Sequence, residues 1–363
     1  MMRTIFVTIP TVAFLLTLLA FVLPQKSSWR IKVIWAIFLF AAFFKFHVFK
    51  IFGGSMLTPE MPEAVIWILN WIYSGVFILF LLSFVWWVKK YRAIVLPIAA
   101  WSVGLGGMLS ATIAPKVTEI TLDYPNLPAE LDGYRIVHLT DLHISAAARR
   151  WRAECIVEKA NSLNADLICL TGDHVDGRAA RHACDLEPIR NLRAKDGVWA
   201  AIGNHELYHR WNEWAPYYER WGIRVLMNEC AFPRPSLALG GVTDVAAMHY
   251  GCGRIPMPDT SRAFAVATNG QFRVLMQHRP EDWVRNRNEF GVDLQLSGHT
   301  HGGIMPIMDK YVAKHNGGFV AGVYDACFPG RLIVSRGAGQ WAGFPCRFFN
   351  PSEIVVVTLK KIR

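Results

Sequence analysis

The chain has 363 residues, of which 53% are hydrophobic, and this apolar composition argues against a fully soluble protein. Its formal net charge is +10, but residues 1–115 contribute +7 of that charge, from nine Lys and Arg against two Glu. Only +3 belongs to the rest of the chain, so the basic character does not indicate a nucleic-acid-binding surface, and we expect no nucleic-acid partner.

Four apolar stretches near the N-terminus predict membrane-spanning helices. They cover residues 5–23, 33–44, 64–88 and 93–114. Because a helix rises about 1.5 Å per residue, roughly 20 apolar residues cross the bilayer core. The second stretch is weaker, because Lys32 and Lys45 crowd its ends, where long side chains can snorkel to the interface. We therefore predict a transmembrane region over 1–115 with about four helices, and a soluble helical bundle is the less favoured alternative.

The short loops between these stretches predict the orientation of the chain. Basic residues gather in the loop 26–32 and in the loop 89–92, which contains Lys89, Lys90 and Arg92. Loops rich in Lys and Arg stay in the cytoplasm, so the last crossing delivers the C-terminal domain to the outer side. We expect a multi-pass protein of the cell (inner) membrane, with its catalytic domain on the periplasmic or extracellular face.

A second domain is predicted over 133–363, after a connector over 116–132. In this domain, short apolar runs alternate with helix-like stretches, which is typical of a layered α/β or α+β domain. Five of the runs end in polar residues of the kinds that bind metals, and open sheets gather their sites at strand ends in this way. Strands are predicted over 134–139, 166–170, 197–202, 272–276 and 292–296, a helix over 150–163, and closing strands over 331–334 and 354–359.

The residues that follow these strands are oxygen and imidazole donors. Asp141 and His143 are two positions apart, as are His299 and His301, so each pair can lie on one face of an extended segment. Neighbouring glycines permit tight turns and close approach of the backbone. A mixture of Asp, Asn and His suits a divalent transition metal. The complete set is Asp141, His143, Asp173, Asn204, His205, His278, His299 and His301.

This ordered set resembles the calcineurin-like metallophosphoesterases from about Pro125 onward. The motifs are Asp141-x-His143, Gly172-Asp173-x-x-Asp176, Gly203-Asn204-His205-Glu206, His278 and Gly298-His299-x-His301. Residues 293–303 and the run Ser335–Gly339 are similar to a bacterial membrane-associated branch of that family. The resemblance implies a fold of two packed β-sheets flanked by helices. It also implies a centre of two divalent metal ions, with Mn, Fe, Zn and Mg as the candidates.

The resemblance further implies a role for each matched residue. One metal would be held by Asp141, His143 and His301, the other by Asn204, His278 and His299, and Asp173 would bridge both. His205 would face the substrate as a general acid or charge stabiliser, oriented by Asp176. Glu206 stands where the family often has Asp, and this departure removes no ligand.

Two such ions suit phosphoester hydrolysis on chemical grounds alone. Two divalent ions about 3.5–4 Å apart can bind a bridging water, lower its pKa, and clamp the attacking and leaving oxygens. An imidazole titrates near neutral pH, so a protonated His205 can supply a proton to the leaving group. A buried carboxylate at Asp176 would raise the pKa of that imidazole and fix its tautomer.

Other chemistry-bearing residues have plainer interpretations. We expect His138 to be structural, while His174, beside the bridging Asp, is a weaker candidate for substrate contact. Residues 207–221 carry aromatic side chains at helical steps, which favours a core helix over a membrane-interface helix. The seven cysteines form no Cys-x-x-Cys pair, which excludes a zinc ribbon and leaves any disulfide pairing open.

We therefore predict a membrane-anchored, dinuclear metal-dependent phosphoester or pyrophosphate hydrolase. A tethered site meets amphiphiles at high local concentration, so a lipid-linked or amphiphilic phosphate is the preferred substrate, with membrane lipids as partners. One alternative is a phosphodiesterase acting on soluble nucleotides or small diesters. Another is a non-catalytic metal-binding membrane sensor or scaffold, which is disfavoured because every ligand position is filled. The metals, the natural substrate and the oligomeric state stay open at this point.

Overall fold

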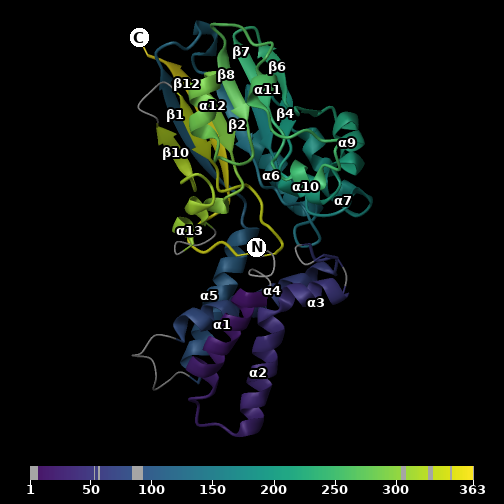
Figure 1. Cartoon of the computed structure of the whole chain (residues 1–363), viewed down its shortest axis with the longest axis vertical. Helices are drawn as coiled ribbons and strands as arrows, with labels where there is room; N and C mark the ends of the chain where they lie inside the picture. Colours follow the sequence, from purple (N-terminus) through teal and green to yellow (C-terminus); the bar gives the residue numbers. More distant parts are fainter. Residues whose placement is uncertain are drawn as a thin grey trace. The chain divides into compact units, whose positions relative to one another are not determined.

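The computed structural model describes residues 7–52, 54–55, 58–83, 93–303, 308–325, 330–343 and 346–362. These residues form two compact units (Figure 1). The helical unit contains the described part of 1–112 together with 342–348, and the sheet unit contains the described parts of 113–341 and 349–363. The domain boundaries expected at residues 115 and 132 stay predictions.

The helical unit contains two helices that are long and apolar enough to cross a membrane. They are α4 (Glu63–Leu82) and α5 (Val95–Thr112), with mean hydropathies of 2.2 and 1.4. A third candidate is a broken span, because α2 (Trp29–Phe43) and α3, which runs over Lys45–Phe52, meet at a bend of 71°. The first apolar helix, Ile9–Val22, is shorter; it comprises α1 (Ile9–Thr17) and a π-helical turn, Leu18–Val22.

The four predicted spans are therefore supported only in part. Two of them correspond to α4 and α5, by length and composition among the described residues. Residues 5–6 and 84–88, at the edges of two predicted spans, lie outside the described residues. So do Lys89, Lys90 and Arg92, on which the predicted orientation depends, and the orientation stays a prediction.

Lys45 is buried in the helical unit. Its Nζ donates a hydrogen bond to Asn70 Oδ1 at 2.8 Å and lies 3.9 Å from the centre of the Tyr73 ring. The expectation that this lysine snorkels is wrong, because the chain bends beside it and α4 supplies both an amide acceptor and an aromatic face.

The described residues of 342–348, from the C-terminal part of the chain, belong to the helical unit. Cys346 Sγ lies 2.7 Å from Ser74 Oγ in α4, and the Arg347 amide donates to the Gly107 carbonyl in α5 at 3.0 Å. A Cβ on Gly107 would overlap the ring of Phe348, so this position needs glycine. The chain thus leaves the sheet unit after Trp341 and re-enters it at Phe349.

The sheet unit is built from two six-stranded sheets. The first has the order β1-β12-β2-β3-β4-β5 and the second β10-β11-β9-β8-β7-β6. The first sheet comprises β1 (Lys116–Tyr124), β2 (Arg135–Leu139), β3 (Leu167–Thr171), β4 (Val198–Ala201), β5 (Arg224–Val225) and β12 (Glu353–Lys361). The second comprises β6 (Glu229–Arg234), β7 (Leu237–Gly241), β8 (Phe272–Met276), β9 (Leu294–Ser297), β10 (Gly322–Asp325) and β11 (Arg331–Val334).

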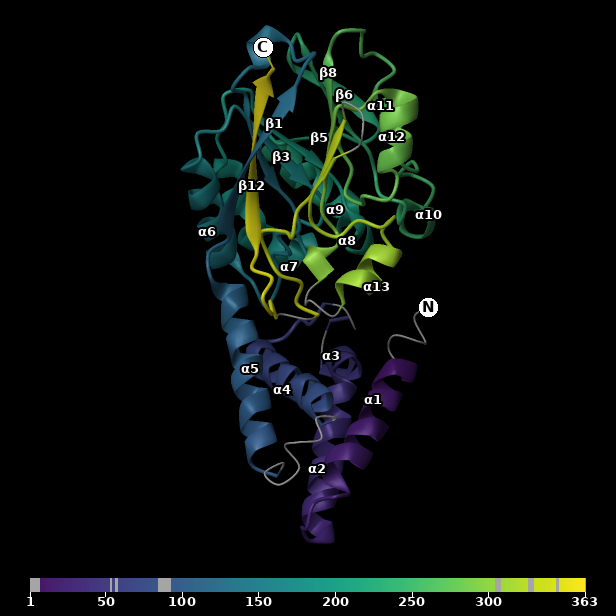
Figure 2. The same cartoon turned by 90° about the vertical axis from the view of Figure 1, so that its left-hand side faces the viewer.

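Helices cover the outer faces of both sheets. Figure 2 shows α6 (Arg150–Asn161) outside the first sheet, and α11 (Thr260–Ala263) and α12 (Trp283–Phe290) outside the second. The remaining helices are α7 (Ala179–Leu186), α8 (Asn204–Tyr208), α9 (Trp211–Arg220), α10 (Ala247–Tyr250) and α13 (Asp309–Lys314), with 3-10 turns at Ala129–Leu131, Glu187–Asn191 and His301–Gly303. The predicted fold of two packed sheets flanked by helices is confirmed.

The core lies between the sheets and beneath their covering helices. Along β2, Ile136 belongs to the cluster between the sheets, whereas Val137 and Leu139 belong to the cluster beneath α6. Successive strand residues point to opposite faces, so a strand covered on both sides reads as a continuous apolar run. This is why the central strands were recognisable in the sequence.

An edge strand was missed in the predicted connector. Residues 116–132 were expected to connect the domains, but they include β1, which pairs parallel with β12 from Lys116 opposite Glu353 to Tyr124 opposite Lys361. Figure 2 shows these two strands side by side. β1 has exposed charged residues along most of its length, as edge strands often do, and this hid its apolar pattern.

The aromatic residues of 207–221 pack inside the sheet unit. Trp211, Trp214 and Tyr218 of α9 are buried and belong to the same cluster as β2 and α6. Their burial confirms the core-helix interpretation, and the membrane-interface interpretation is wrong.

Candidate metal centre

The predicted ligand residues follow strands that lie side by side. β2, β3 and β4 are parallel neighbours in the first sheet, and β8 and β9 are parallel neighbours in the second. The C-terminal ends of parallel neighbours share one edge of a sheet, so the five loops that follow these strands converge there.

Five of the predicted ligands have positive φ angles that are unusual for residues with a side chain. The angles are 53° for Asp141, 44° for His143, 54° for Asp173, 68° for His299 and 49° for His301. Each such conformation costs on the order of 1–3 kcal/mol and is typical of functional sites. The extended geometry predicted for the two spaced pairs is therefore wrong, because all four residues have left-handed backbone; Asp141 and His143 belong to one group of neighbouring ligand atoms, whereas His299 and His301 belong to different groups.

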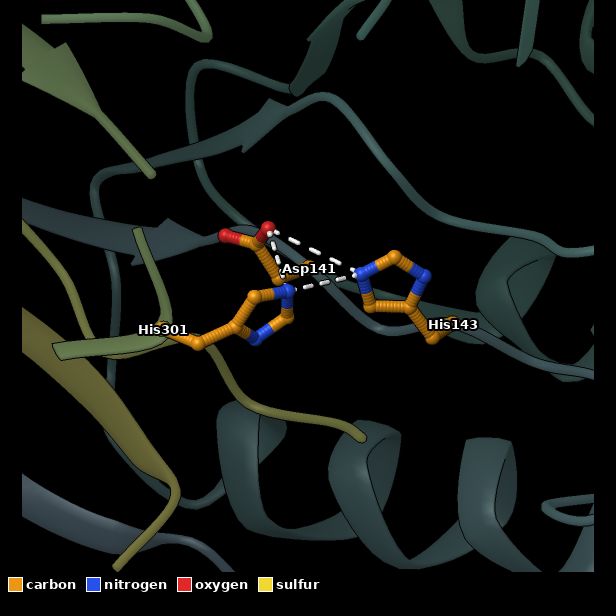
Figure 3. A group of neighbouring side chains, drawn as sticks. All are labelled: Asp141, His143 and His301. Carbon is orange, nitrogen blue, oxygen red and sulfur yellow. Dashed lines mark hydrogen bonds and ion pairs between the residues drawn. The ribbon is translucent and has the colours of Figure 1, made fainter. Parts of the chain in front are cut away.

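Asp141, His143 and His301 form the first group (Figure 3). The Nε2 atoms of the two histidines are 3.2 Å apart, and Asp141 Oδ1 lies 3.5 Å from His301 Nε2 and 3.8 Å from His143 Nε2. Atoms bound to one ion at about 2.0–2.2 Å are roughly 3–3.5 Å from each other. The three donor atoms therefore have nearly the spacing that a single metal ion requires.

Asp176 orients His143 from behind. Its Oδ1 lies 2.9 Å from His143 Nδ1, so the Nδ1–H donates to the carboxylate and the Nε2 lone pair faces the first group. Burial alone would raise the pKa of Asp176, but electrostatic attraction and hydrogen bonds from the imidazoles of His143 and His205 outweigh it and hold that pKa well below its usual range. The carboxylate is therefore ionised and keeps the ring in this tautomer.

Asp173, His278 and His299 form the second group, with ligand atoms all within 4.8 Å of one another. His278 Nε2 lies 3.1 Å from Asp173 Oδ2, while its Nδ1–H donates to the Thr171 carbonyl at 2.8 Å. The rings of His278 and His299 meet edge to face, with centres 5.2 Å apart. The backbone contact thus orients the ring so that Nε2 of His278 faces the carboxylate.

Asp173 lies between the two groups. Its Oδ2 is 3.1 Å from His278 Nε2 in the second group and 3.9 Å from His143 Nε2 in the first. Its Oδ1 accepts a hydrogen bond from the His205 amide at 2.8 Å. The position of this one carboxylate fits a ligand shared by two ions.

Asn204 presents a buried acceptor beside the second group. Its Oδ1 has no hydrogen-bond partner among the described residues. The residues on either side of Asn204 in the sequence both contact Asp173. The His205 amide donates a hydrogen bond to Asp173 Oδ1, and a Cβ added to Gly203 would overlap the same oxygen. A buried acceptor without a partner costs about 1–3 kcal/mol, which a bound cation would offset. The donor set and this orphaned oxygen fit a second metal ion.

A family model described as calcineurin-like phosphoesterase matches residues 134–303, which contain all of these residues. The chain belongs to the calcineurin-like metallophosphoesterase family. An uncharacterised metallophosphoesterase from Helicobacter pylori is 30% identical over 256 residues, which is 70% of this chain and 66% of that protein. One from Campylobacter jejuni is 31% identical over 254 residues, covering 69% and 65%.

A vertebrate relative of this metallophosphoesterase is named as a transmembrane protein. The transmembrane protein with metallophosphoesterase domain from Danio rerio is 30% identical over 269 residues, covering 70% of this chain and 60% of that protein. The matches thus span less than two thirds of the length of each of these relatives.

Glu206 has a structural role in this metallophosphoesterase that its sequence alone did not indicate. Its Oε2 accepts hydrogen bonds from the Asp173 amide at 2.9 Å and the Gly203 amide at 2.7 Å, and its Oε1 accepts from the His174 amide at 2.6 Å. The carboxylate thereby ties the Asp173 loop to the start of α8. The position of Glu206 in the Gly-Asn-His-Glu motif could have suggested this role, but the hydrogen-bond partners are known only from the fold.

His174 and His138 take no part in either group. His174 Nε2 accepts a hydrogen bond from the Gly172 amide at 3.1 Å, and its Nδ1–H donates to Tyr218 Oη at 2.8 Å. Burial lowers the pKa of His174, which keeps this ring neutral. Both nitrogens face protein partners, so the weaker hypothesis of substrate contact is not supported. His138 is buried in β2, in accord with its expected structural role.

His205 lies beside the two ligand groups and is anchored by Asp176. Its Nδ1 lies 2.5 Å from Asp176 Oδ1, and its side chain keeps 11% exposure, while that of His143 is fully buried. Burial lowers the pKa of His205, but the carboxylates of Asp173 and Asp176 outweigh it and raise that pKa. A protonated imidazole with one nitrogen anchored leaves Nε2 as the donor.

Proposed function

We propose that this chain is a metal-dependent phosphohydrolase that uses two divalent ions. The main support is the position of the Asp173 carboxylate between two groups of ligand atoms. One ion would be held by Asp141, His143 and His301, the other by Asn204, His278 and His299, with Asp173 touching both. When bound, the ions would supply Lewis acidity and a water activated for attack at phosphorus.

His205 would donate the proton that the leaving group needs. Its exposed edge and raised pKa favour the protonated form, and Asp176 keeps Nδ1 engaged so that Nε2 carries the transferable proton. The same protonated ring would offset negative charge on the phosphoryl oxygens. Asp176 would act only by position, since its contacts are with His143 and His205.

The preferred substrate in this proposal is a lipid-linked or amphiphilic phosphate. Support comes from α4 and α5, which are apolar enough to hold the chain at a bilayer, and from a relative named as a transmembrane protein. An enzyme held at a membrane meets amphiphilic substrates at a raised local concentration. A phosphodiesterase activity on soluble nucleotides or small diesters is the competing outcome.

The site can be tested with full-length protein purified in detergent and loaded with manganese. Hydrolysis of p-nitrophenyl phosphate, bis(p-nitrophenyl) phosphate, a lipid phosphate and a lipid diphosphate would rank the substrate classes. Asp173→Asn should abolish turnover and lower the metal content, whereas Asp123→Asn, at an exposed position of β1, should change neither. Full turnover by Asp173→Asn would contradict the two-ion proposal.

The membrane arrangement is a separate part of the proposal. Basic loops at 26–32 and 89–92 support a multi-pass topology with the phosphoesterase domain on the outer face. In a bacterial host, alkaline phosphatase fused to the C-terminus should be active, because that reporter folds only outside the cytoplasm. A reporter that stays inactive while the fusion protein is present in the membrane would reverse the orientation.

A further inference from the structure

Arg279 borders the second ligand group, directly after His278 at the end of β8. Its Nε donates to Asp244 Oδ2 at 2.7 Å. Asp244 follows β7, which pairs in parallel with β8, so the two residues meet at the edge where the ligand loops converge. The Asp244 side chain is only 1% exposed and that of Arg279 is 20% exposed, so the ion pair is largely shielded from water.

Among the described residues, most of the hydrogen-bonding capacity of this guanidinium has no protein partner. A guanidinium has five N–H donors in a planar fork, and the Nε–H is the one that contacts Asp244. Its terminal nitrogens, Nη1 and Nη2, donate to no residue in the described part of the chain. A shielded cation of this kind is costly unless an acceptor completes its contacts.

Arg279 lies close to the ligand groups. It directly follows His278, a residue of the second group. Its charge is close enough to act on His299 of that group and on Tyr208. The Tyr208 ring centre is 5.3 Å from that of His205. The guanidinium therefore lies near one proposed metal ligand, His299, and near a neighbour of the proposed proton donor, His205.

We propose that Arg279 is a substrate-binding residue, whose Nη1 and Nη2 donate paired hydrogen bonds to phosphate oxygens of the substrate. A guanidinium matches two oxygens of a phosphate at once, which an ammonium does not. Asp244 holds the fork by its Nε edge and leaves the terminal edge to the ligand. The inference rests on the proposed function, since it supplies a further contact to the phosphate on which that function acts.

The first test measures the binding of inorganic phosphate to the full-length, manganese-loaded protein by titration calorimetry. Arg279→Gln should weaken phosphate binding roughly 10- to 100-fold. The phosphate affinity of Arg279→Lys should lie between those of Arg279→Gln and the wild type. The matched control is Arg285→Gln, since Arg285 is 64% exposed and pairs with Glu289 within α12. That control should bind phosphate as the wild type does, and all variants should contain the same amount of metal.

The second test separates binding from turnover. With the best substrate found for the wild type, Arg279→Gln should raise KM by a similar factor, a change that a purely structural role would not produce at unchanged metal content and thermal stability. Phosphate affinity within twofold of the wild type in Arg279→Gln would overturn the assignment. If that variant fails to fold, an unchanged affinity in Arg279→Lys would overturn it instead.

The two proposals can fail independently. A wild-type protein that binds metal and phosphate but hydrolyses none of the substrates defeats the proposed function, while the calorimetric comparison still decides the role of Arg279. Conversely, a hydrolase whose Arg279→Gln variant keeps its phosphate affinity and KM retains its function and loses this contact. A wild type that loads metal yet binds no phosphate defeats the Arg279 assignment.

Discussion

One carboxylate oxygen, Asp176 Oδ1, serves two imidazoles with different proposed roles. It lies 2.9 Å from His143 Nδ1 and 2.5 Å from His205 Nδ1. His143 belongs to the first ligand group, whereas His205 is the proposed proton donor. Substitutions at these positions should therefore separate metal binding from proton transfer.

His205→Asn should lower kcat and leave the metal content unchanged. General acid catalysis contributes roughly 10²- to 10⁴-fold, and the loss should lie in that range. The defect should be smaller for substrates with a good leaving group, such as nitrophenolate, than for alkyl phosphates. Equal losses on both substrate types would contradict a role in proton donation.

Asp176→Asn should reduce both turnover and metal content. The Asn amide accepts fewer hydrogen bonds than the carboxylate does, and it no longer fixes the tautomer of His143. Elemental analysis beside kcat, with His205→Asn measured in parallel, distinguishes the two substitutions. Unchanged metal content in Asp176→Asn would show that His143 needs no orienting partner.

Asp293 links the stability of the sheet unit to pH. Burial raises the pKa of Asp293 to about 6, although its Oδ2 accepts a hydrogen bond from the Arg273 amide at 2.8 Å. In an unfolded chain, this carboxyl would have a pKa of about 3.9. The folded state therefore holds a proton that the unfolded state releases, and the free energy of unfolding falls as pH rises from about 4 to about 6.

Replacing Asp293 with Asn should remove this pH dependence. The amide oxygen can still accept the Arg273 amide proton, so the variant should be more stable than the wild type at pH 7, by up to about 3 kcal/mol. Below about pH 4 the two proteins should unfold alike. Denaturant unfolding followed by Trp fluorescence would measure both differences. A variant that is less stable at pH 7 would contradict the proposed ionisation.

At the scale of the elements, the loop after β11 packs closely against the Asp141 loop. A Cβ on Gly337 would lie 2.6 Å from Asp141 Cβ, and Gly337 has a φ of +82°. The amides of Ala338 and Gly339 donate to the carbonyls of Thr140 and Asp141, both at 2.9 Å. This contact from a distant part of the chain supports the ligand loop.

Gly337→Ala should therefore displace Asp141 and lower the metal content. Gly270→Ala is a matched control, because Gly270 has a φ of +87° but no atom within 4 Å of an added Cβ. Both variants carry the same kind of backbone strain, and only the first has the overlap. Similar metal contents in the two variants would show that the contact with Asp141 is not required.

Different parts of this unit were predictable for different reasons. β8 and β11 were predicted with the same first and last residues as in the structure, because these strands are mostly apolar on both faces. β1 was missed because exposed charged residues lie between its apolar ones. The ligand residue types followed from strand-end spacing, but their left-handed backbone did not, because no residue pattern favours it at Asp or His over glycine. The partners of Glu206 and the second contact of Asp176 depend on loops brought together only by the fold.

At the scale of the whole molecule, the described residues of 342–348 belong to the helical unit although they come from the C-terminal part of the chain. A fragment that begins at Ile113 would lack Ser74 and Gly107, which contact Cys346 and Arg347 in the full chain. We expect this fragment to aggregate, because Cys346 and Phe348, which are buried in the full chain, would lose their neighbours in α4 and α5. Replacing 342–348 with Gly and Ser in the fragment should improve its monomer content by gel filtration. No improvement would show that other surfaces cause the aggregation.

Residues on either side of that segment contact histidines of the candidate metal centre. The Trp341 ring centre is 6.4 Å from that of His205, and Asn350 Nδ2 donates to the His301 carbonyl at 2.7 Å. The chain between Trp341 and Asn350 thus passes through the helical unit before it returns to the candidate metal centre. Turnover should therefore be measured in bilayers of more than one lipid composition as well as in detergent.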